Sequence, residues 1–451
     1  MDTGRTEEKP AIEYTAQAVS PIVNGEVKLT IGENSFSAIA LFGAVEVLYA
    51  KVNALDFTDY VITVKTDEGD YTFSRMGQWA QPFYDALCEA YNKAVLRAFF
   101  VSGEPLFKAN GEYRFKENGM ALNGKAPVYV YENCIVALPP NDNARRIPLC
   151  FTTGMDKGDY ELTIRLNTGE TYTFAKLGYD TAMFAEVLEK QIRALREKAL
   201  ATAKALDPSL TAMQGSQLAC IMPEGAAASV GDLIKIAPSF VAALEAGIAD
   251  TRAVESYAMF KEMSDPAQIW AGIMKNETQA TDANGSDGDG AGADGSSDVG
   301  DIAGMLGGLT GGGNPLEVLG GLTGNASPND EKTETPQPAP YLFWMIAPSP
   351  DGRYMAVEFT EANTATFVYG TSGDFSMAAA QLNRALEAIS FKREVIRLTN
   401  EELMKPENAD YYMAAKRTAS LQFIRGRFTG RVVHSSPEAW KRRLTEMWSA
   451  E

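Results

Sequence analysis

The chain has 451 residues with 41 Lys plus Arg against 59 Asp plus Glu, which gives a formal net charge of −18 at pH 7. This balance argues against a protein that wraps DNA or RNA, because such binding depends on clustered cations. No apolar stretch approaches the ~20 residues of a membrane-spanning helix and no signal-peptide pattern opens the chain, so we expect a cytoplasmic protein without a transmembrane segment.

An internal repeat follows residues 1–19, for which we expect a flexible N-terminus. The sequences DYVITVK and GDYTF, in residues 59–73, recur as DYELTIR and GETYTF in residues 159–174. In both copies a glycine follows shortly afterwards, Gly77 or Gly178, and then an amphipathic helical pattern begins. This many matched positions in the same order indicate a duplicated structural unit.

Each copy has the pattern of a β-hairpin followed by a helix. Apolar and polar residues alternate before the glycine, and apolar residues recur at three and four positions after it. Further strand patterns precede each hairpin, at residues 27–31, 35–41 and 45–49 and at residues 113–115, 127–131 and 134–138. Roughly five to seven strands and one terminal helix predict a small, partly open β-barrel that the helix closes.

This pattern resembles bacterial members of the pleckstrin-homology-like superfold, whose β-meander also ends in a hairpin followed by a helix. The resemblance covers about residues 20–205 and includes no diagnostic motif. It implies two tandem domains, at residues 20–101 and 102–205, of a type that docks proteins or binds anionic lipid headgroups. An unrelated duplicated α+β domain is the alternative.

The middle of the chain changes character twice. Residues 206–275 have apolar-periodic runs separated by prolines, which predicts a helical subdomain packed on the barrels. Residues 276–339 are rich in Gly, Asp, Ser and Thr and carry eleven acids against one lysine, so we expect a disordered, acidic linker. Residues 287–298 within it faintly imitate a calcium loop but lack the usual glutamate at position twelve, and we expect no calcium site.

Residues 340–451 predict a C-terminal α+β domain with a basic helical tail. A strand at residues 341–347 and a hairpin-then-helix pattern at residues 354–389 suggest a third, degenerate unit, and whether it completes a barrel stays open. Ser436 before Pro437 is typical of a helix start.

Basic residues that could bind anions or partners fall into two groups. The candidates are Arg114, Lys116 and Lys125 in the second repeat and Arg425, Arg427 and Arg431 in the tail. In the tail, glycines beside the arginines allow close approach of the backbone to an anion. The alternative is that these charges lie on solvated faces of the fold.

Histidine and cysteine are scarce. The chain has one histidine, His434, and the four cysteines Cys88, Cys134, Cys150 and Cys220 form no CxxC pair. This composition provides no zinc-ligand pattern and no histidine-assisted nucleophile. We expect no metal, no cofactor and no enzymatic activity.

The sequence therefore predicts an α+β protein: two pleckstrin-homology-like barrels, a helical subdomain, a linker and a C-terminal α+β domain. The function we expect is that of a non-catalytic scaffold or adaptor that binds protein partners. The first alternative is peripheral association with anionic membranes through the second repeat or the basic tail. An enzyme with an unrecognised site is the second.

Overall fold

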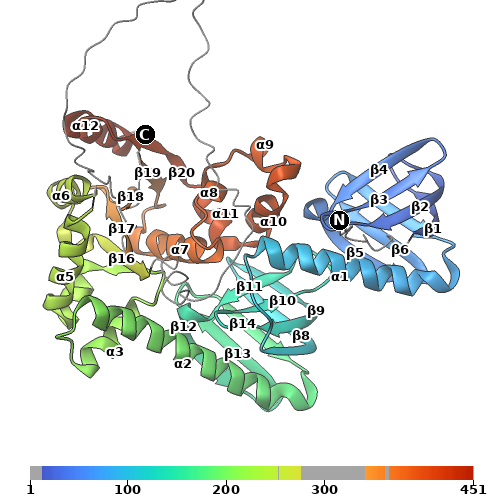
Figure 1. Ribbon diagram of the computed structural model, residues 1–451, viewed down its shortest axis with the longest axis horizontal. Coiled ribbons are helices and arrows are strands. Elements are labelled where there is room, and N and C mark those ends of the chain that lie inside the picture. The colour runs from blue at the N-terminus through green and yellow to red at the C-terminus, as the bar shows by residue number, and fades with distance from the viewer. Residues whose placement is uncertain (1–12, 252, 276–340, 361–364, 450–451) are drawn as a thin grey trace, which may run out of the picture. The chain divides into compact units, whose positions relative to one another are not determined.

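The computed structural model describes residues 13–251, 253–275, 341–360 and 365–449. They form an α+β fold with two seven-stranded antiparallel sheets, each followed by a long helix, then a helical segment and a six-stranded antiparallel sheet with further helices (Figure 1). The predicted linker at residues 276–339 and the calcium-like run at residues 287–298 lie outside the described residues.

The first β domain comprises seven strands and one helix. Its elements are β1 (Tyr14–Val19), β2 (Gly25–Ile31), β3 (Ser35–Ala40), β4 (Gly43–Leu48), β5 (Val52–Thr58), β6 (Val61–Thr66), β7 (Gly69–Ser74) and α1 (Ala80–Ala98). The strand order is β4-β3-β2-β1-β7-β6-β5, so β4 and β5 are the edges of the sheet. Along α1, Phe83, Leu87 and Tyr91 recur at four-residue spacing and are buried in the core of this domain.

Strand β1 lies within residues 1–19, for which the sequence predicts flexibility. Tyr14, Ala16 and Ala18 are buried and alternate with more exposed positions, as in a strand with one face on a core. Two of these three residues are alanines, which give a weak hydrophobic signal. The first β domain therefore begins before residue 20.

The second β domain repeats this topology. Its elements are β8 (Phe107–Glu117), β9 (Met120–Val130), β10 (Cys134–Ala137), β11 (Arg145–Pro148), β12 (Thr152–Lys157), β13 (Glu161–Leu166), β14 (Thr171–Ala175) and α2 (Thr181–Leu206). The strand order β11-β10-β9-β8-β14-β13-β12 is that of the first β domain, which confirms the structural duplication. The duplicated phenylalanines make the same contact, Phe73 with Phe83 and Phe174 with Phe184, at ring-centroid distances of 6.4 and 5.5 Å.

The helical segment is not separate from the C-terminal sheet. It contains α3 (Ala212–Ile221), β15 (Ala227–Ser229), α4 (Val230–Ile236), α5 (Pro238–Ala249), α6 (Val254–Met263) and β16 (Trp270–Lys275). Strands β15 and β16 are the first two of six in the sheet β15-β16-β17-β18-β19-β20. Leu244 and Ile248 of α5 share a core with Met345 and Val368 of that sheet. The sequence predicts a separate helical subdomain here, whereas two of its strands belong to the C-terminal sheet, because pairing with strands distant in the chain leaves no local pattern.

The rest of the C-terminal sheet and its helices follow residue 340. These elements are β17 (Tyr341–Pro348), β18 (Tyr354–Phe359), β19 (Ala365–Gly370), α7 (Phe375–Ala388), α8 (Glu394–Arg397), α9 (Asn400–Leu403), α10 (Ala409–Arg417), α11 (Ala419–Arg425), β20 (Phe428–Val433) and α12 (Pro437–Trp448). The predicted hairpin and helix are present as β18, β19 and α7, but in a sheet with a different strand order from the two β domains. Ser436 caps α12, as expected, by accepting a hydrogen bond from the Ala439 N–H.

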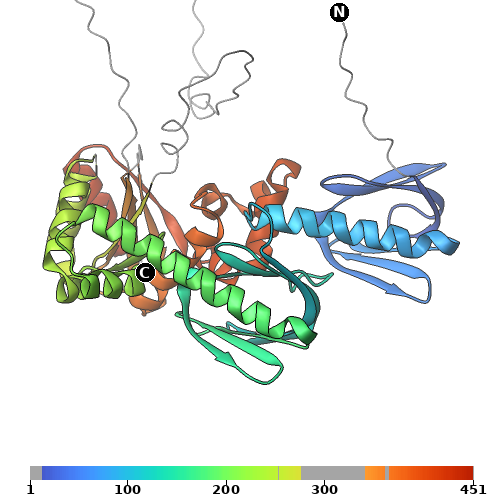
Figure 2. The same cartoon turned by 60° about the horizontal axis from the view of Figure 1, so that its bottom comes forward.

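Strands β16 and β17 are antiparallel neighbours, with Lys275 opposite Tyr341. Residues 276–340 thus leave and re-enter the sheet at adjacent positions. Elsewhere, helix α2 extends from the second β domain to the helical segment, where α3 and α5 pack against it (Figure 2). The buried residues Ala199 and Ala203 near its C-terminal end allow this close packing.

Candidate functional site

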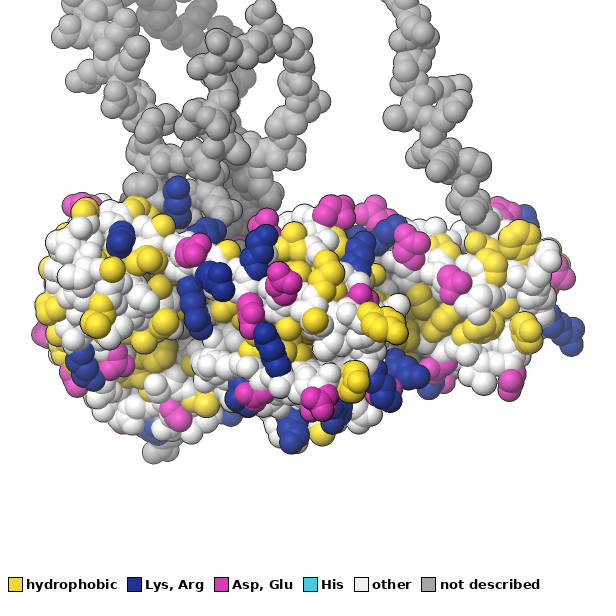
Figure 3. Space-filling view, turned by 90° about the horizontal axis from the view of Figure 1, so that it is seen from below, with side chains coloured by type: hydrophobic (Ala, Val, Ile, Leu, Met, Phe, Trp, Pro, Cys, Tyr) yellow, Lys and Arg dark blue, Asp and Glu magenta, His cyan; other side chains and the backbone are white. Residues whose placement is uncertain are grey.

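The basic residues predicted in the second repeat lie on the exposed side of the β8–β9 hairpin. Arg114 forms an ion pair with Glu161, and Lys125 is the register partner of Glu112. Lys116 is exposed near the end of β8. Figure 3 shows Lys and Arg side chains interspersed with Asp and Glu over the face in view. The structure thus brings the three cations onto one hairpin, together with carboxylates.

The predicted residues of the tail have different surroundings. Arg425 donates hydrogen bonds to the carbonyl oxygens of Val395 and Leu398, so its guanidinium holds α8 and the following turn in place. Burial lowers the pKa of Arg425. Arg427 is exposed and stacks on Phe423 at 5.4 Å, and Arg431 is exposed on β20. Arg425 is therefore a structural residue, and Arg427 and Arg431 remain accessible.

Buried ion pairs attach α7 to the second β domain. Arg146 of β11 pairs with Glu387, and Arg384 pairs with Glu170 at 2.6 Å. The four side chains are at most 11% exposed. The sequence alone does not reveal these pairs, because their members are far apart in the chain and each has the pattern of an ordinary surface charge.

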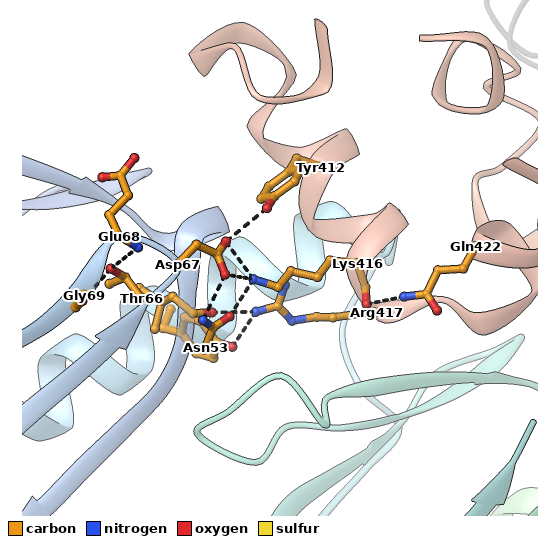
Figure 4. A network of polar contacts seen from close by, with 11 residues as sticks. Asn53, Thr66, Asp67, Glu68, Gly69, Tyr412, Lys416, Arg417 and Gln422 are labelled. Atoms are coloured by element: carbon orange, nitrogen blue, oxygen red, sulfur yellow. Dashed lines mark hydrogen bonds and ion pairs between the residues drawn. The ribbon is translucent and has the colours of Figure 1, made fainter. Parts of the chain in front are cut away.

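A polar network joins α10 to the first β domain (Figure 4). The Lys416 ammonium donates hydrogen bonds to Asn53 Oδ1 at 2.5 Å and to both Asp67 carboxylate oxygens at 2.9 Å. The Tyr412 hydroxyl donates to the same carboxylate at 3.0 Å. Partial burial acts to raise the pKa of Asp67, but the hydrogen bonds from Lys416 and Asn53 outweigh it, and the pKa is lowered.

Arg417 lies beside this network and is 1% exposed. Its Nη2 atom donates to the Val52 carbonyl oxygen at 3.1 Å and to the Tyr91 hydroxyl at 2.8 Å. Among the described residues, its Nε and Nη1 atoms have no hydrogen-bond partner. Arg417 therefore fixes α10 against both β5 and α1 of the first β domain.

Two cavities flank this junction, with volumes of about 450 and 240 Å³. Both are lined by Leu403, Met404 and Tyr412, and the smaller also by Leu48 and Ala50. The charged groups around them are largely ion-paired or bonded to the main chain, as described for Lys416 and Arg425. The smaller cavity is also lined by Lys51, Asp67, Glu68 and Lys405, of which Lys51 is paired with Glu68 and Asp67 with Lys416.

The edge of β5 is occupied by a loop of the second β domain, residues 138–144, which we call the docking loop. The Leu55 N–H donates to the Pro140 carbonyl oxygen, and the Asp142 N–H donates to the Asn53 carbonyl oxygen, both at 2.8 Å. Asn141 forms a β-bridge with Ala54. The docking loop thus extends the first sheet by a short antiparallel segment.

The counterpart of this edge in the second β domain is β12. Both edge strands carry a register shift at their first residues, between Val52 and Ala54 and between Thr152 and Gly154. Met155 therefore corresponds to Leu55. In the part of the chain that the structure describes, no strand pairs with the outer side of β12.

Side-chain burial shows the same difference between the two edges. Leu55, Tyr91 and Ala94 of the first β domain are at most 2% exposed. Their counterparts, Met155, Ile192 and Leu195, pack on the second core but stay partly exposed. We call the outer side of β12 with these three apolar residues the β12 edge. The β12 edge is thus equivalent to the β5 edge, to which the docking loop binds, but no described segment pairs with it.

No protein-family model and no curated protein matches the sequence. Within the described ranges, no three His, Cys, Asp or Glu side chains are grouped in a way that could hold a metal ion. No helix in the described part of the chain is long and apolar enough to cross a membrane. The candidate site is thus defined by geometry alone.

One signal in the sequence marks the docking loop. The first repeat turns at Leu41 and Phe42, whereas the second has a longer segment with Pro139 and Pro140 at the corresponding place. An insertion with consecutive prolines favours an extended segment. The β12 edge itself leaves no such signal, because an unpaired edge strand has the same pattern as a paired one.

Proposed function

We propose that the protein is a non-catalytic scaffold or adaptor that binds protein partners through tandem pleckstrin-homology-like domains. The observation that carries the proposal is the pair of equivalent edges, one filled by the docking loop and one open. A partner segment would pair with β12 as the docking loop pairs with β5, with main-chain hydrogen bonds for affinity and side-chain contacts for specificity. The apolar side chains that it would contact are Met155, Ile192 and Leu195.

The strand order and the closing helix support the pleckstrin-homology-like assignment. In each β domain, seven antiparallel strands form one sheet in which the first strand pairs with the last, and an amphipathic helix covers the core. Pairing of the first and last strands curls the sheet into a partly open barrel. Fold alone does not decide function, so the proposal rests on the β12 edge.

The chemistry of the described side chains supports a non-catalytic role. Burial raises the pKa of the Cys88 and Cys134 thiols to about 11, which keeps them protonated and poorly nucleophilic at neutral pH. The buried carboxylates of Glu170 and Glu387 are paired with arginines. The hydroxyl beside His434, that of Thr366, is fully buried and is also hydrogen-bonded to Glu358 and Trp440.

A peptide with the sequence of residues 136–144, labelled with a fluorophore, tests the β12 edge in the full-length protein. We expect it to bind with an affinity typical of short peptides, and Met155→Pro to weaken binding by at least ~10-fold, because proline removes the N–H that corresponds to that of Leu55. Fluorescence anisotropy measures the affinity. Proline is tolerated in edge strands, and thermal unfolding verifies that the variant is folded.

Met155→Ala is the matched control, since it keeps the N–H and removes only side-chain contact. We expect it to weaken binding less than Met155→Pro does. A peptide that binds the proline variant as tightly as the unmodified protein would place its site elsewhere. No binding to the unmodified protein at millimolar peptide would reject the β12 edge as a docking site.

Anionic membranes are the alternative ligand, favoured by one observation. Arg114, Lys116, Lys125 and the nearby Lys176 lie on the β8–β9 hairpin and β14 side of the second β domain, where they outnumber the carboxylates Glu112 and Glu161. Flotation with phosphatidylserine vesicles tests this alternative. A membrane-binding protein floats at low salt and is released at moderate salt, and Lys116→Glu with Lys125→Glu prevents flotation.

A further inference from the structure

One end of the first β domain exposes large apolar side chains. The turn between β3 and β4, which we call the tip, presents Leu41 at 87% and Phe42 at 91% exposure. Ile39, beside it on β3, is 49% exposed. The neighbouring β1–β2 turn adds Val19 and Ile22, at 61% and 59% exposure. Hydrophobic side chains gather over this domain at the right of Figure 3. Apolar patches of this kind mark interaction surfaces.

The tip is the counterpart of the docking loop. Leu48 pairs with Ser35 in the β3–β4 hairpin, and Pro148 pairs with Cys134 in the β10–β11 hairpin. With this alignment, Ile39 corresponds to Leu138, the first residue of the docking loop. Leu138 and Ala144 of the docking loop are buried in the core of the first β domain, whereas the tip contacts nothing comparable in the described residues.

We infer that the β12 edge of one chain receives the tip of a second copy of the same chain. This inference rests on the proposed function of the β12 edge and names its partner. Within one chain, the docking loop, which is the β10–β11 counterpart of the tip, already pairs with the edge of β5. The chain then has one free turn and one free edge left over, the tip and the β12 edge. A second copy would repeat the internal contact between molecules.

The two surfaces match in chemistry. Ile39, Leu41 and Phe42 of the tip would cover the partly exposed Met155, Ile192 and Leu195 and remove both sets from water.

Charges of both signs lie beside the two surfaces. Lys28 is the register partner of Ile39 and pairs with Glu13, and Glu189 of α2 pairs with Lys157 of β12. The apolar side chains and the unpaired main chain of β12, rather than net charge, therefore carry the proposed contact.

The resulting contact is head-to-tail, because it joins two different surfaces of the same chain. Contacts of this type build closed rings when the rotation between copies closes, and otherwise open chains with one free tip and one free edge at the ends. The turn at the tip is shorter than the docking loop, so the tip would contact the β12 edge through side chains more than through main-chain hydrogen bonds. The contact is therefore small, and we expect association only at high protein concentration.

Sedimentation velocity over a concentration series tests the inference with two variants of the full chain. We expect the unmodified protein to form oligomers that grow with concentration. Phe42→Asp, which alters only the tip, and Met155→Pro, which alters only the β12 edge, should each be monomeric. A 1:1 mixture of the two should form a heterodimer that does not grow, because only one intact tip and one intact edge can meet. Met213→Asp, at another exposed apolar residue, should associate like the unmodified protein.

Several outcomes would overturn the inference. An unmodified protein that stays monomeric at all concentrations rules out the second copy, and peptide binding to β12 would then leave the proposed function standing. Oligomers that persist in Phe42→Asp would assign association to another surface. A mixture of the two variants that remains monomeric would also contradict the head-to-tail contact.

Discussion

Mutation of the buried pair of Arg146 and Glu387 should change the stability of the fold differently when one charge is removed and when both are removed. Removal of one partner leaves a charge in a nearly water-free environment, where it is poorly solvated. Replacement of both by apolar residues removes the cost of burying either. At the residue scale, we expect this pair to make the attachment of α7 specific more than strong.

We predict that Glu387→Ala lowers the free energy of unfolding by about 3–5 kcal/mol, because it leaves Arg146 buried without a counterion. Urea denaturation monitored by circular dichroism measures the change. The double variant Arg146→Met with Glu387→Leu should recover most of the loss. The exposed pair of Lys93 and Glu89 provides the control, and Glu89→Ala should cost less than about 0.5 kcal/mol. An equal loss for both single variants would contradict the role of burial.

His434 gives the C-terminal domain a pH dependence. A hydrogen bond with Glu358 raises the pKa of His434, against the opposing effect of its partial burial. Because the pKa of His434 is higher in the folded state, protonated His434 stabilises the fold fully at pH values below its unfolded-state pKa of ~6.5. This stabilisation is lost as the pH rises through the folded-state pKa. We predict that the protein loses stability over this range, measured as the melting temperature at several pH values. His434→Gln should remove that part of the slope, and an unchanged slope would assign it to another group.

At the scale of elements, the repeated contact between a strand phenylalanine and a helix phenylalanine holds each sheet to its helix. Phe174 and Phe184 are fully buried. We predict that Phe184→Ala lowers the free energy of unfolding by about 3–5 kcal/mol, and that Phe83→Ala has a similar effect in the first β domain. Urea denaturation measures both. Tyr179→Ala, at a fully exposed ring, should have almost no effect. A loss below 1 kcal/mol at Phe184 would contradict the contact.

The sequence predicted elements whose pattern is local and missed those that depend on distant pairing. The duplicated hairpin and helix follow from periods of two and 3.6 residues, which any short window contains. Strand β16 joins a sheet whose next strand begins at Tyr341, and the sequence alone could not show that pairing. The same reason hid the docking loop and the ion pair of Arg146 with Glu387, whose members are 241 positions apart.

The candidate site was only partly predictable. The three cations Arg114, Lys116 and Lys125 were found by residue type and are indeed accessible. Arg425 has the same residue type, but its guanidinium is bound to main-chain carbonyls, which composition could not reveal. The β12 edge became visible only when the burial of equivalent residues in the two β domains could be compared.

At the scale of the whole molecule, polar contacts join the two β domains to each other and to the C-terminal helices. The docking loop attaches the first β domain to the second, Arg417 attaches the first to α10, and the ion pairs of α7 attach the second. Interfaces of this kind couple the unfolding of the parts they join. We therefore expect the described residues to unfold as one cooperative unit.

We predict that Arg417→Ala separates the first β domain from this unit. The substitution removes the hydrogen bonds to Val52 and Tyr91 and leaves a cavity between β5 and α10. Differential scanning calorimetry should show one transition for the unmodified protein and two for the variant. Glu401→Ala, at an exposed residue of α9, should keep one transition. Two transitions in the unmodified protein would contradict the coupling.

The adjacency of Lys275 and Tyr341 has a consequence for how freely the intervening sequence can vary. The two residues are register partners on neighbouring antiparallel strands, so β16 ends beside the start of β17. Two antiparallel strands need only a two-residue connection, and loop closure costs little more for a long connection than for a short one. The sheet is therefore indifferent to the length and composition of this insert. Mutation can therefore lengthen, shorten or replace it while β16 and β17 keep their register.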